Sequence, residues 1–214
     1  MARAPSAGKT RLAQYLSPPR LEGLRRALLA DTLDEVAHAR GAEDEAVVFV
    51  APAGSEAEIA TLAAQPFSYV SQPDGDLGQR MKAAFEELLI GRRCEAALLV
   101  GSDIPLLDGG MLAEAGEAVR SIDGVVLGPA DDGGYYLIGM SQLHAAVFDG
   151  VAWGTATVLE ETLRAAERAA ISTRLIRRAF DVDTIEDLQR VERVLASAPP
   201  GAAPRLRQWF ASGR

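Results

Sequence analysis

The sequence predicts an α/β fold in which a mostly parallel sheet is flanked by helices. Short, continuous apolar runs such as "AVVFVAP" (46–52) and "GVVLGPA" (124–130) have the length of strands and are bounded by turn residues. Stretches with apolar residues at helical spacing lie between these runs. Continuous rather than alternating apolar strands are typical of parallel sheets that are covered on both faces.

The individual elements follow from local patterns. Three helices are predicted to begin at capping boxes, at Ser55/Glu58, Asp76/Gln79 and Thr184/Asp187. The first of these is expected over 55–65 and the last over 184–197. Further helices are predicted over 20–39, 110–120 and 155–169. Strands are predicted over 46–52, 67–70, 96–101, 124–130, 135–140 and 173–178.

Length and composition restrict the class of protein. The 214 residues suit one α/β domain, expected over 1–197 and followed by a Pro-rich tail over 198–214. A net charge of −8 argues against a nucleic-acid binder. The chain contains neither an apolar run long enough to span a membrane nor a signal-peptide pattern, and its single Cys94 forms no internal disulfide. We therefore expect a cytoplasmic protein.

Carboxylates and cations must carry any chemistry, because the sequence has only two histidines. The run "AALLVGSDIP" ends a buried strand on Asp103, and ligands of parallel sheets bind beyond the carboxyl ends of the strands. Such an aspartate can bind a hard cation that also carries ligand phosphates. A turn or helix-capping aspartate explains the pattern equally well.

The loop "MARAPSAGKTRL" offers cations at Lys9, Arg11 and Arg3 on an otherwise acidic chain. These cations predict a phosphate-binding loop, and a solvated N-terminus is the alternative. The "GKT" triplet resembles a nucleotide-binding P-loop, but Arg3 stands where that pattern needs glycine.

Two further segments have residue types suited to ligands. "GPADDGGYYLIG" (128–139) combines two acids, two glycines and two tyrosines, which allows close approach of a ligand and also fits an Asp-Gly hairpin turn. "FDVDTIEDL" places Asp181 and Asp183 on one side of an extended segment. Such a pair can share a metal, and Asp183 can also merely precede the next helix.

The order of these motifs resembles a bacterial family known as domain-of-unknown-function 2064, or as selenodomain-associated glycosyltransferase-like proteins. The motifs are "KTRL", "GDLGQRM" (75–81), "GSDIP" (101–105), "GPADDGGYYLIG" (128–139), "WGTATV" (153–158) and "DVDT" (181–184). The family is similar to 2-phospho-lactate guanylyltransferases and, more distantly, to molybdenum-cofactor nucleotidyltransferases. The resemblance spans about residues 1–195. It implies the Rossmann-like GT-A fold of nucleotide-diphosphosugar transferases.

The resemblance also implies a role for each matching residue. Lys9, Arg11 and Asp103 would be catalytic, and they would bind the nucleotide together with Gly75, Asp76 and Gly78. The residues expected at the acceptor are Asp131, Asp132, Gly133, Gly134, Trp153 and Thr155. Asp103 and Asp183 would hold a divalent metal, Mg²⁺ or Mn²⁺.

The function favoured by this pattern is metal-dependent glycosyl transfer from a nucleotide-diphosphosugar to a small acceptor. Nucleotidyl transfer to a phosphorylated small molecule is the alternative, and a nucleotide-binding relic without turnover is the third hypothesis. Two departures from the family pattern fall on its phosphate-binding end. The apolar first strand is missing, as in a truncated chain or one whose start lies upstream of Met1, and the loop before "KTRL" is about two residues short. The first of them, the missing strand, favours the relic, whereas the presence of all the acidic motifs argues against it.

Overall fold

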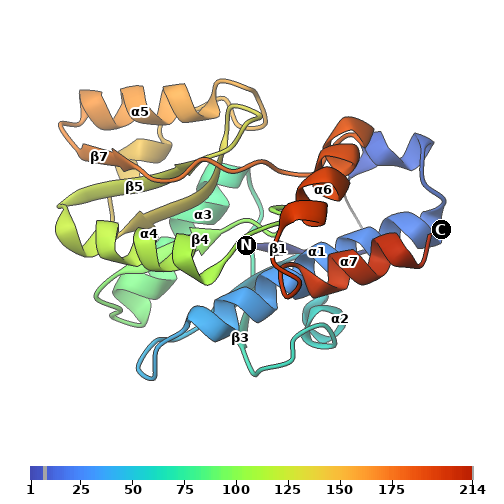
Figure 1. Ribbon diagram of the computed structural model, residues 1–214. Helices are drawn as coiled ribbons and strands as arrows, with labels where there is room; N and C mark the ends of the chain where they lie inside the picture. The colour runs from blue at the N-terminus through green and yellow to red at the C-terminus, as the bar shows by residue number, and fades with distance from the viewer. Residues whose placement is uncertain (7–8, 214) are drawn as a thin grey trace. The chain divides into compact units, whose positions relative to one another are not determined.

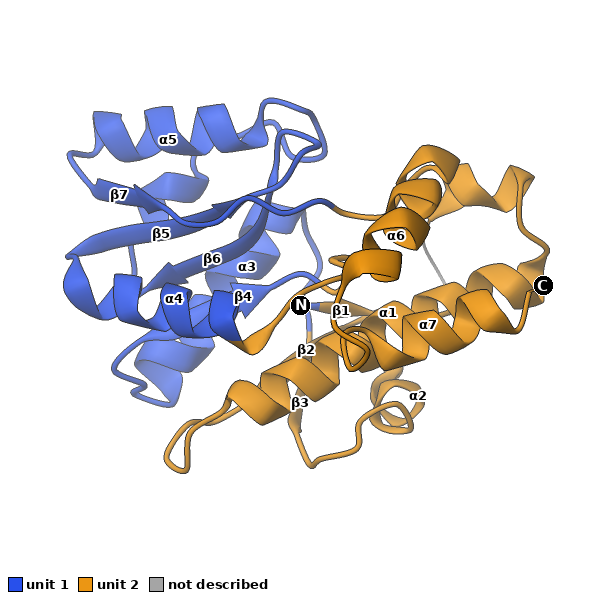
Figure 2. Ribbon diagram, viewed as in Figure 1, with its two compact units in different colours: residues 1, 72–101, 110–180 blue, residues 2–71, 102–109, 181–214 orange. Residues whose placement is uncertain are grey.

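The computed structural model describes residues 1–6 and 9–213, which form two compact units (Figure 2). Unit 1 comprises residues 1, 72–101 and 110–180. Unit 2 comprises residues 2–71, 102–109 and 181–214. Helices flank a sheet in each unit (Figure 1), so the predicted α/β class is confirmed.

Unit 2 contains a parallel sheet in the order β1-β2-β3. Its strands are β1 (Ala2–Arg3), β2 (Val47–Ala51) and β3 (Ser68–Ser71). Its helices are η1 (Thr10–Gln14, a 3₁₀ helix), α1 (Pro18–Ala39), α2 (Glu56–Ala60), α6 (Ile185–Ser197) and α7 (Pro204–Ala211). The core of this unit forms where α1 packs on the sheet through Leu29, Leu33, Val48 and Val50, all buried.

The expectation that the first strand is missing needs correction. Ala2 pairs with Val50 and Arg3 with Ala51 in parallel register, and the Ala4 N–H continues the ladder to the Ala51 carbonyl at 2.8 Å. Two residues are too few to show an apolar run or a period of two, so sequence patterning could not find this strand. The strand leads the chain directly into the loop that carries Lys9.

Unit 1 contains a four-stranded sheet in the order β4-β6-β5-β7. Its strands are β4 (Ala97–Val100), β5 (Gly124–Pro129), β6 (Tyr135–Met140) and β7 (Ser172–Leu175). β6 runs antiparallel to both of its neighbours, whereas β5 and β7 are parallel. The predicted strand runs are therefore present, and the "DDGG" segment is the turn of the β5–β6 hairpin.

The helices of unit 1 lie beside its sheet (Figure 1). They are α3 (Leu77–Phe85), η2 (Glu86–Gly91, a π-helix), α4 (Gly109–Ser121), η3 (Ala145–Phe148, a 3₁₀ helix) and α5 (Val158–Arg168). α3 packs against β4 and α5 against β7. The buried residues of α3 include Met81 and Phe85, and those of α5 include Val158 and Ala166.

The predicted capping boxes of Asp76 and Thr184 are confirmed at the starts of α3 and α6. The one at Ser55 is wrong, because its side chain makes no capping hydrogen bond. The carboxylate of its partner Glu58 instead contacts the Arg26 guanidinium at 3.7 Å and the Ser6 hydroxyl at 3.5 Å. The helix that follows, α2, is correspondingly short.

The Pro-rich tail contains helix α7, which packs on α1 within unit 2 (Figure 1). Leu206 and Trp209 are buried. The Trp209 indole N–H donates to the Arg20 carbonyl at 2.9 Å, and the Arg20 guanidinium lies 3.7 Å from the ring centroid. Cation–π contacts of this kind stabilise the packing of an aromatic ring.

A carboxylate on α1 caps the start of α7. Asp31 is 8% exposed and accepts the backbone N–H groups of Arg205 at 2.9 Å and Leu206 at 3.0 Å. Burial raises the pKa of Asp31, and the two N–H donors counteract this effect. The residue at the helix's own N-cap, Ala203, has no side chain able to cap, so Asp31 supplies the acceptor from a distant part of the chain.

The Asp31→Ala variant is expected to lower the free energy of unfolding by about 1–3 kcal/mol, because two N–H groups lose their acceptor. Urea denaturation followed by circular dichroism measures the change. Glu22→Ala is the matched control: it removes an exposed carboxylate from the same helix, paired with Arg26, and should cost less than about 1 kcal/mol. Equal losses in both variants would contradict the capping role.

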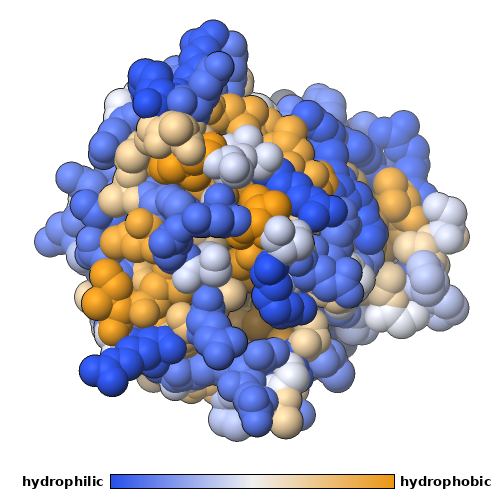
Figure 3. Space-filling view, turned by 90° about the vertical axis from the view of Figure 1, so that its left-hand side faces the viewer, coloured by the Kyte–Doolittle hydropathy of each residue, from blue (hydrophilic) through white to orange (hydrophobic). Residues whose placement is uncertain are grey.

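Exposed apolar side chains are scattered over the described residues. The face in Figure 3 shows apolar areas interrupted by hydrophilic groups. The large apolar residues that stand exposed are Tyr15, Leu77, Ile90 and Leu175, each on or beside a different element. None of the helices in the described part of the chain has the length and apolar character needed to cross a membrane.

Candidate functional site

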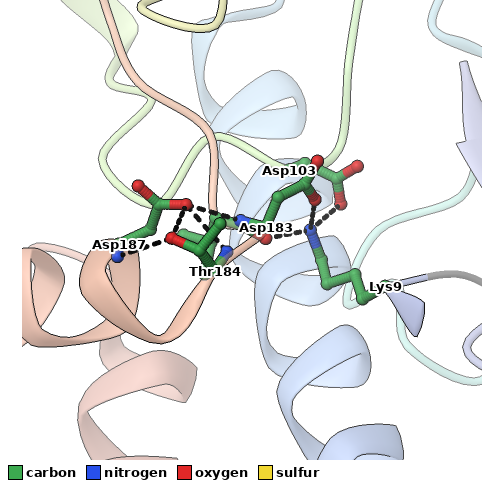
Figure 4. Close-up of polar contacts among 6 residues, drawn as sticks. Lys9, Asp103, Asp183, Thr184 and Asp187 are labelled. Carbon is green, nitrogen blue, oxygen red and sulfur yellow. Dashed lines mark hydrogen bonds and ion pairs between the residues drawn. The ribbon is translucent and has the colours of Figure 1, made fainter. Parts of the chain in front are cut away.

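Three segments that are far apart in the sequence meet around the side chain of Lys9 in unit 2 (Figure 4). Its ammonium Nζ lies 3.0 Å from Asp103 Oδ1, 3.4 Å from Asp183 Oδ1 and 2.5 Å from the Val182 carbonyl oxygen. The Lys9 side chain is 5% exposed, whereas those of Asp103 and Asp183 are 54% and 42% exposed. A buried cation therefore joins two carboxylates that remain open to solvent.

Local structure holds Asp183 in place. One oxygen of the Asp187 carboxylate accepts the N–H of Asp183 at 3.0 Å and that of Thr184 at 2.8 Å, at the start of α6 (Figure 4). Val182, one residue earlier, is fully buried, and its N–H donates to the Asp103 carbonyl at 3.2 Å. The backbone around both carboxylates is thus fixed by hydrogen bonds, which leaves the Asp183 side chain directed at Lys9.

Lys9 itself has a left-handed backbone, with φ at 48°. Non-glycine residues adopt this region uncommonly, and such strain is concentrated at functional sites. η1 follows directly, with the Leu12 N–H bound to the Lys9 carbonyl at 3.1 Å, and the Leu12 side chain is fully buried. The packing of Leu12 therefore holds the loop in the geometry that points Lys9 inward.

A cavity of about 260 Å³ opens beside these groups. Its lining residues are Arg3, Lys9, Arg25, Leu29, Ser102, Asp103 and Asp183, all from unit 2. Three cations on one small cavity are suited to an anion with several charges, such as a diphosphate. The two carboxylates on the same wall are suited to a cation bound to that anion.

Sequence reasoning missed Arg25 and Ser102. Arg25 lies on α1, and one of its terminal nitrogens donates to the Pro5 carbonyl at 3.1 Å, so it also contacts the loop before Lys9. One feature of the sequence does indicate where Arg25 lies, namely its spacing along the helix. Arg25 is four residues from both Leu21 and Leu29, so it shares the inward face of the helix with two buried leucines.

Arg11 lies on η1 with an exposed side chain and does not line this cavity. Gly8, which the P-loop comparison required, lies outside the described residues. Asp181 also does not line the cavity, so Asp183 is the member of that pair found there.

The carboxylates fit a metal that a ligand helps to hold. The described residues contain no group of three or more His, Cys, Asp or Glu side chains that could hold an ion by themselves. Mg²⁺ commonly binds through one or two carboxylates and completes its shell with phosphates and water. Asp103 and Asp183, half exposed and meeting at one nitrogen, match that pattern.

The predicted nucleotide-binding residues Gly75, Asp76 and Gly78 lie in unit 1 at the start of α3. The Asp76 carboxylate accepts the Gln79 N–H at 2.9 Å, so it caps the helix. A Cβ on Gly78 would lie 2.4 Å from the Trp153 ring. Only glycine allows this ring to lie against the helix, and the predicted nucleotide and acceptor segments therefore touch within unit 1.

The predicted acceptor residues form two adjoining loops of unit 1. In the hairpin turn, Asp132 accepts the Gly134 N–H at 2.8 Å, and Asp131 lies 3.8 Å from the Arg178 guanidinium. The Gly133 carbonyl accepts the N–H of Leu159 at 2.9 Å. The "DDGG" turn and the segment that begins α5 are thereby held side by side.

The loop that carries Trp153 and Thr155 is braced from α5. Glu161 accepts the Ala152 N–H at 2.6 Å and the Thr157 hydroxyl at 2.8 Å, and these bonds lower the pKa of its carboxyl. The Thr155 hydroxyl donates to the Ala152 carbonyl at 2.8 Å. Hydrogen bonds within the loop and to Glu161 therefore fix the conformation of the loop.

Comparisons with known proteins agree with this architecture. The fold is that of nucleotide-diphospho-sugar transferase-like α/β proteins. A structure described as a "putative nucleotide-diphospho-sugar transferase", from Desulfovibrio desulfuricans G20, is 27% identical and has a TM-score of 0.87. The match covers 98% of this chain and 93% of that chain. A family model described as "Uncharacterized protein conserved in bacteria (DUF2064)" matches residues 32–155. Because this is more than half of the chain, the protein belongs to the DUF2064 family.

A more distant likeness shows the fold alone. The 4-diphosphocytidyl-2C-methyl-D-erythritol synthase from Anaerococcus prevotii is 13% identical, with a TM-score of 0.57. That match covers 79% of this chain and 86% of the synthase. No curated protein matches the chain.

Proposed function

We propose that this protein is a metal-dependent transferase that binds a nucleotide-diphosphosugar and transfers its glycosyl group to a small acceptor. The observation that carries the proposal is the convergence of Lys9, Asp103 and Asp183 at a cavity also lined by Arg3 and Arg25. The likeness to the Desulfovibrio protein supports the transferase class. The identities of the donor and the acceptor and the dependence on a metal are proposals.

The chemistry of glycosyl transfer suits this set of charges. Negative charge develops on the diphosphate as the bond to the sugar breaks, and preorganised cations lower the energy of that state. Lys9 and the cavity arginines would bind the phosphate oxygens through charge-assisted hydrogen bonds. Asp103 and Asp183 would hold a Mg²⁺ or Mn²⁺ ion, which when bound neutralises the leaving diphosphate as a Lewis acid.

Nucleotidyl transfer to a phosphorylated small molecule is the second candidate. The same cations and carboxylates could stabilise in-line displacement at an α-phosphate, from which pyrophosphate leaves. The "KTRL" loop favours this candidate, because it resembles the corresponding loop of guanylyltransferases. The leaving group separates the two reactions: nucleoside diphosphate for glycosyl transfer and pyrophosphate for nucleotidyl transfer.

The experiment that tests the function is a ligand panel followed by a product assay. Nucleoside triphosphates and nucleotide-sugars are added with and without Mn²⁺, and the thermal midpoint of unfolding is measured. A ligand at 100 times its Kd should add about 2.7 kcal/mol of stability. Stabilising donors are then incubated with candidate acceptors, and the release of nucleoside diphosphate or pyrophosphate is measured. If no nucleotide or nucleotide-sugar shifts the midpoint, with or without Mn²⁺, the proposal is wrong. Binding without turnover would favour the relic.

The single variants Lys9→Ala and Arg11→Ala should show which of the two cations of the N-terminal loop binds the phosphates of a nucleotide. Lys9→Ala is expected to weaken binding of a nucleoside diphosphate by about 1.5–3 kcal/mol and to leave nucleoside binding almost unchanged. Arg11→Ala should cost less, because Arg11 is exposed and outside the cavity lining. Isothermal titration calorimetry measures both affinities. If Lys9→Ala weakens nucleoside and diphosphate binding equally, Lys9 does not bind the phosphates.

A further inference from the structure

The ammonium of Lys9 is bound much as a small metal ion would be. A lysine ammonium has three N–H donors, and three oxygens lie around Lys9 Nζ, one each from Val182, Asp103 and Asp183. Two of the three oxygens belong to the carboxylates of Asp103 and Asp183, which are proposed to bind the divalent ion. The side chain therefore places a positive charge next to the oxygens that the metal needs.

The choice of lysine at this position is unusual for this chain. Of its 22 basic residues only Lys9 and Lys82 are lysine, and the rest are arginine. A guanidinium is planar and presents its donors as a fork, whereas an ammonium is a compact point charge that can contact several oxygens converging on one atom. The three oxygens around Nζ require the second geometry.

We propose that Lys9 is an internal counter-cation that makes the Asp103–Asp183 pair selective for a metal–diphosphate complex over the bare metal ion. This inference rests on the proposed function. A bare divalent ion approaching the two carboxylates meets the repulsion of the ammonium and must compete with it for the same oxygens. A diphosphate that arrives with the ion supplies new oxygens for the ammonium. The ammonium then attracts the negatively charged metal–diphosphate complex, whereas it repels the bare ion.

The proposal has a thermodynamic signature. If Lys9 opposes the metal alone and favours the metal with diphosphate, the two ligands bind with positive coupling, and each strengthens the other by the same factor. Removing the charge of Lys9 should therefore change the two separate affinities in opposite directions. A residue that only maintains the fold of the loop would weaken both.

Calorimetric titration of the wild-type protein and of Lys9→Met tests this signature. The ligands are Mn²⁺ alone, inorganic pyrophosphate in metal-free buffer, and pyrophosphate in the presence of Mn²⁺. We expect Lys9→Met to bind Mn²⁺ alone at least about ten-fold more tightly, since like charges a few ångströms apart repel strongly at a protein surface. We expect it to bind pyrophosphate alone at least about ten-fold more weakly, because it loses a charge-assisted contact.

Two further variants serve as controls. Lys82→Met makes the same substitution at the other lysine, which lies 3.9 Å from Glu86 on the surface of unit 1, and should leave all three affinities unchanged. Lys9→Arg retains the charge and should not gain affinity for Mn²⁺. Circular dichroism verifies the fold of each variant, and Lys9→Gln replaces Lys9→Met if the latter fails to fold.

Each result decides the proposal. Tighter Mn²⁺ binding together with weaker pyrophosphate binding by Lys9→Met supports it. If the wild type binds Mn²⁺ with pyrophosphate but Lys9→Met gains no affinity for Mn²⁺, the counter-cation role is overturned and the proposed function stands. If the wild type binds neither pyrophosphate nor nucleotide in the presence of Mn²⁺, the proposed function fails, and the inference fails with it.

Discussion

The Asp103→Asn variant is expected to lose metal-dependent nucleotide binding while it keeps its fold. Asparagine preserves the shape of the side chain but removes the anionic oxygens that a hard cation requires. Substitutions of the residues that merely orient metal ligands cost 10–100-fold in affinity, so loss of a direct ligand should cost at least about 100-fold. Calorimetry with a nucleotide and Mn²⁺ measures the loss.

The fold should survive this change for a structural reason. The Asp103 side chain is 54% exposed, and Lys9 retains its contacts with Asp183 and Val182 when Asp103 is neutral. A hydrogen bond to a charged group such as the buried Lys9 ammonium contributes about 1.5–3 kcal/mol, which is less than the roughly 5–15 kcal/mol stability of a typical protein. Asp44→Asn is the matched control, because it removes the same charge from an exposed turn of the same unit. Unchanged nucleotide affinity in Asp103→Asn would make Asp103 a turn residue and contradict the central assignment.

The parts of the fold that the sequence could predict are those fixed by neighbouring residues. The starts of α3 and α6 are encoded by a side chain and an acceptor three residues apart, so both Asp76 and Thr184 were identified as caps. Ser55 has the same local pattern, but Glu58 is held by Arg26 and Ser6, residues distant in the sequence. The local pattern is the same in all three cases, and tertiary contacts decided the difference.

Elements stabilised from a distance escaped sequence reasoning. The start of α7 depends on Asp31, which is 174 residues away from Arg205, and no pattern near Ala203 indicates a cap. β1 exists because Ala2 and Arg3 pair with a buried strand, although two residues have no pattern of their own. A helix or strand that is stabilised by a distant part of the chain has no pattern in its own residues from which it could be predicted.

The residues of the candidate site also differ in whether the sequence could identify them. Asp103 was identified because it follows an apolar run expected to be a parallel strand, at whose carboxyl end ligands bind. That strand, β4, is instead antiparallel to its neighbour β6, so the premise was wrong although Asp103 does line the cavity. Lys9 and Asp183 were matched through the order of the motifs, and the structure brings both to Asp103. Arg25 was missed because an arginine usually faces solvent, although its spacing of four residues from two buried leucines indicates the inward face of α1, where it lines the cavity.

The Gly133→Ala variant is expected to be the most damaging single methyl addition in the "DDGG" turn. Gly133 has φ at 90°, in the region that favours glycine, and a Cβ there would lie 1.9 Å from the backbone oxygen of Ala156. The strain of the φ angle costs about 1–3 kcal/mol. Forcing apart two backbone segments adds about 1–3 kcal/mol. We therefore expect a loss of about 2–6 kcal/mol in the free energy of unfolding, measured by urea denaturation.

The neighbouring glycine supplies the matched control. A Cβ on Gly134 would meet the Asp132 side chain at 3.2 Å, which can move, and Gly134 has no left-handed φ. Gly134→Ala should therefore cost less than about 1 kcal/mol. Because Leu159 binds the Gly133 carbonyl, the damage from Gly133→Ala should extend to the start of α5, where amide hydrogen exchange should accelerate. Equal stability of the two variants would contradict the close approach of the turn to Ala156 and, with it, the placement of the predicted acceptor loops side by side.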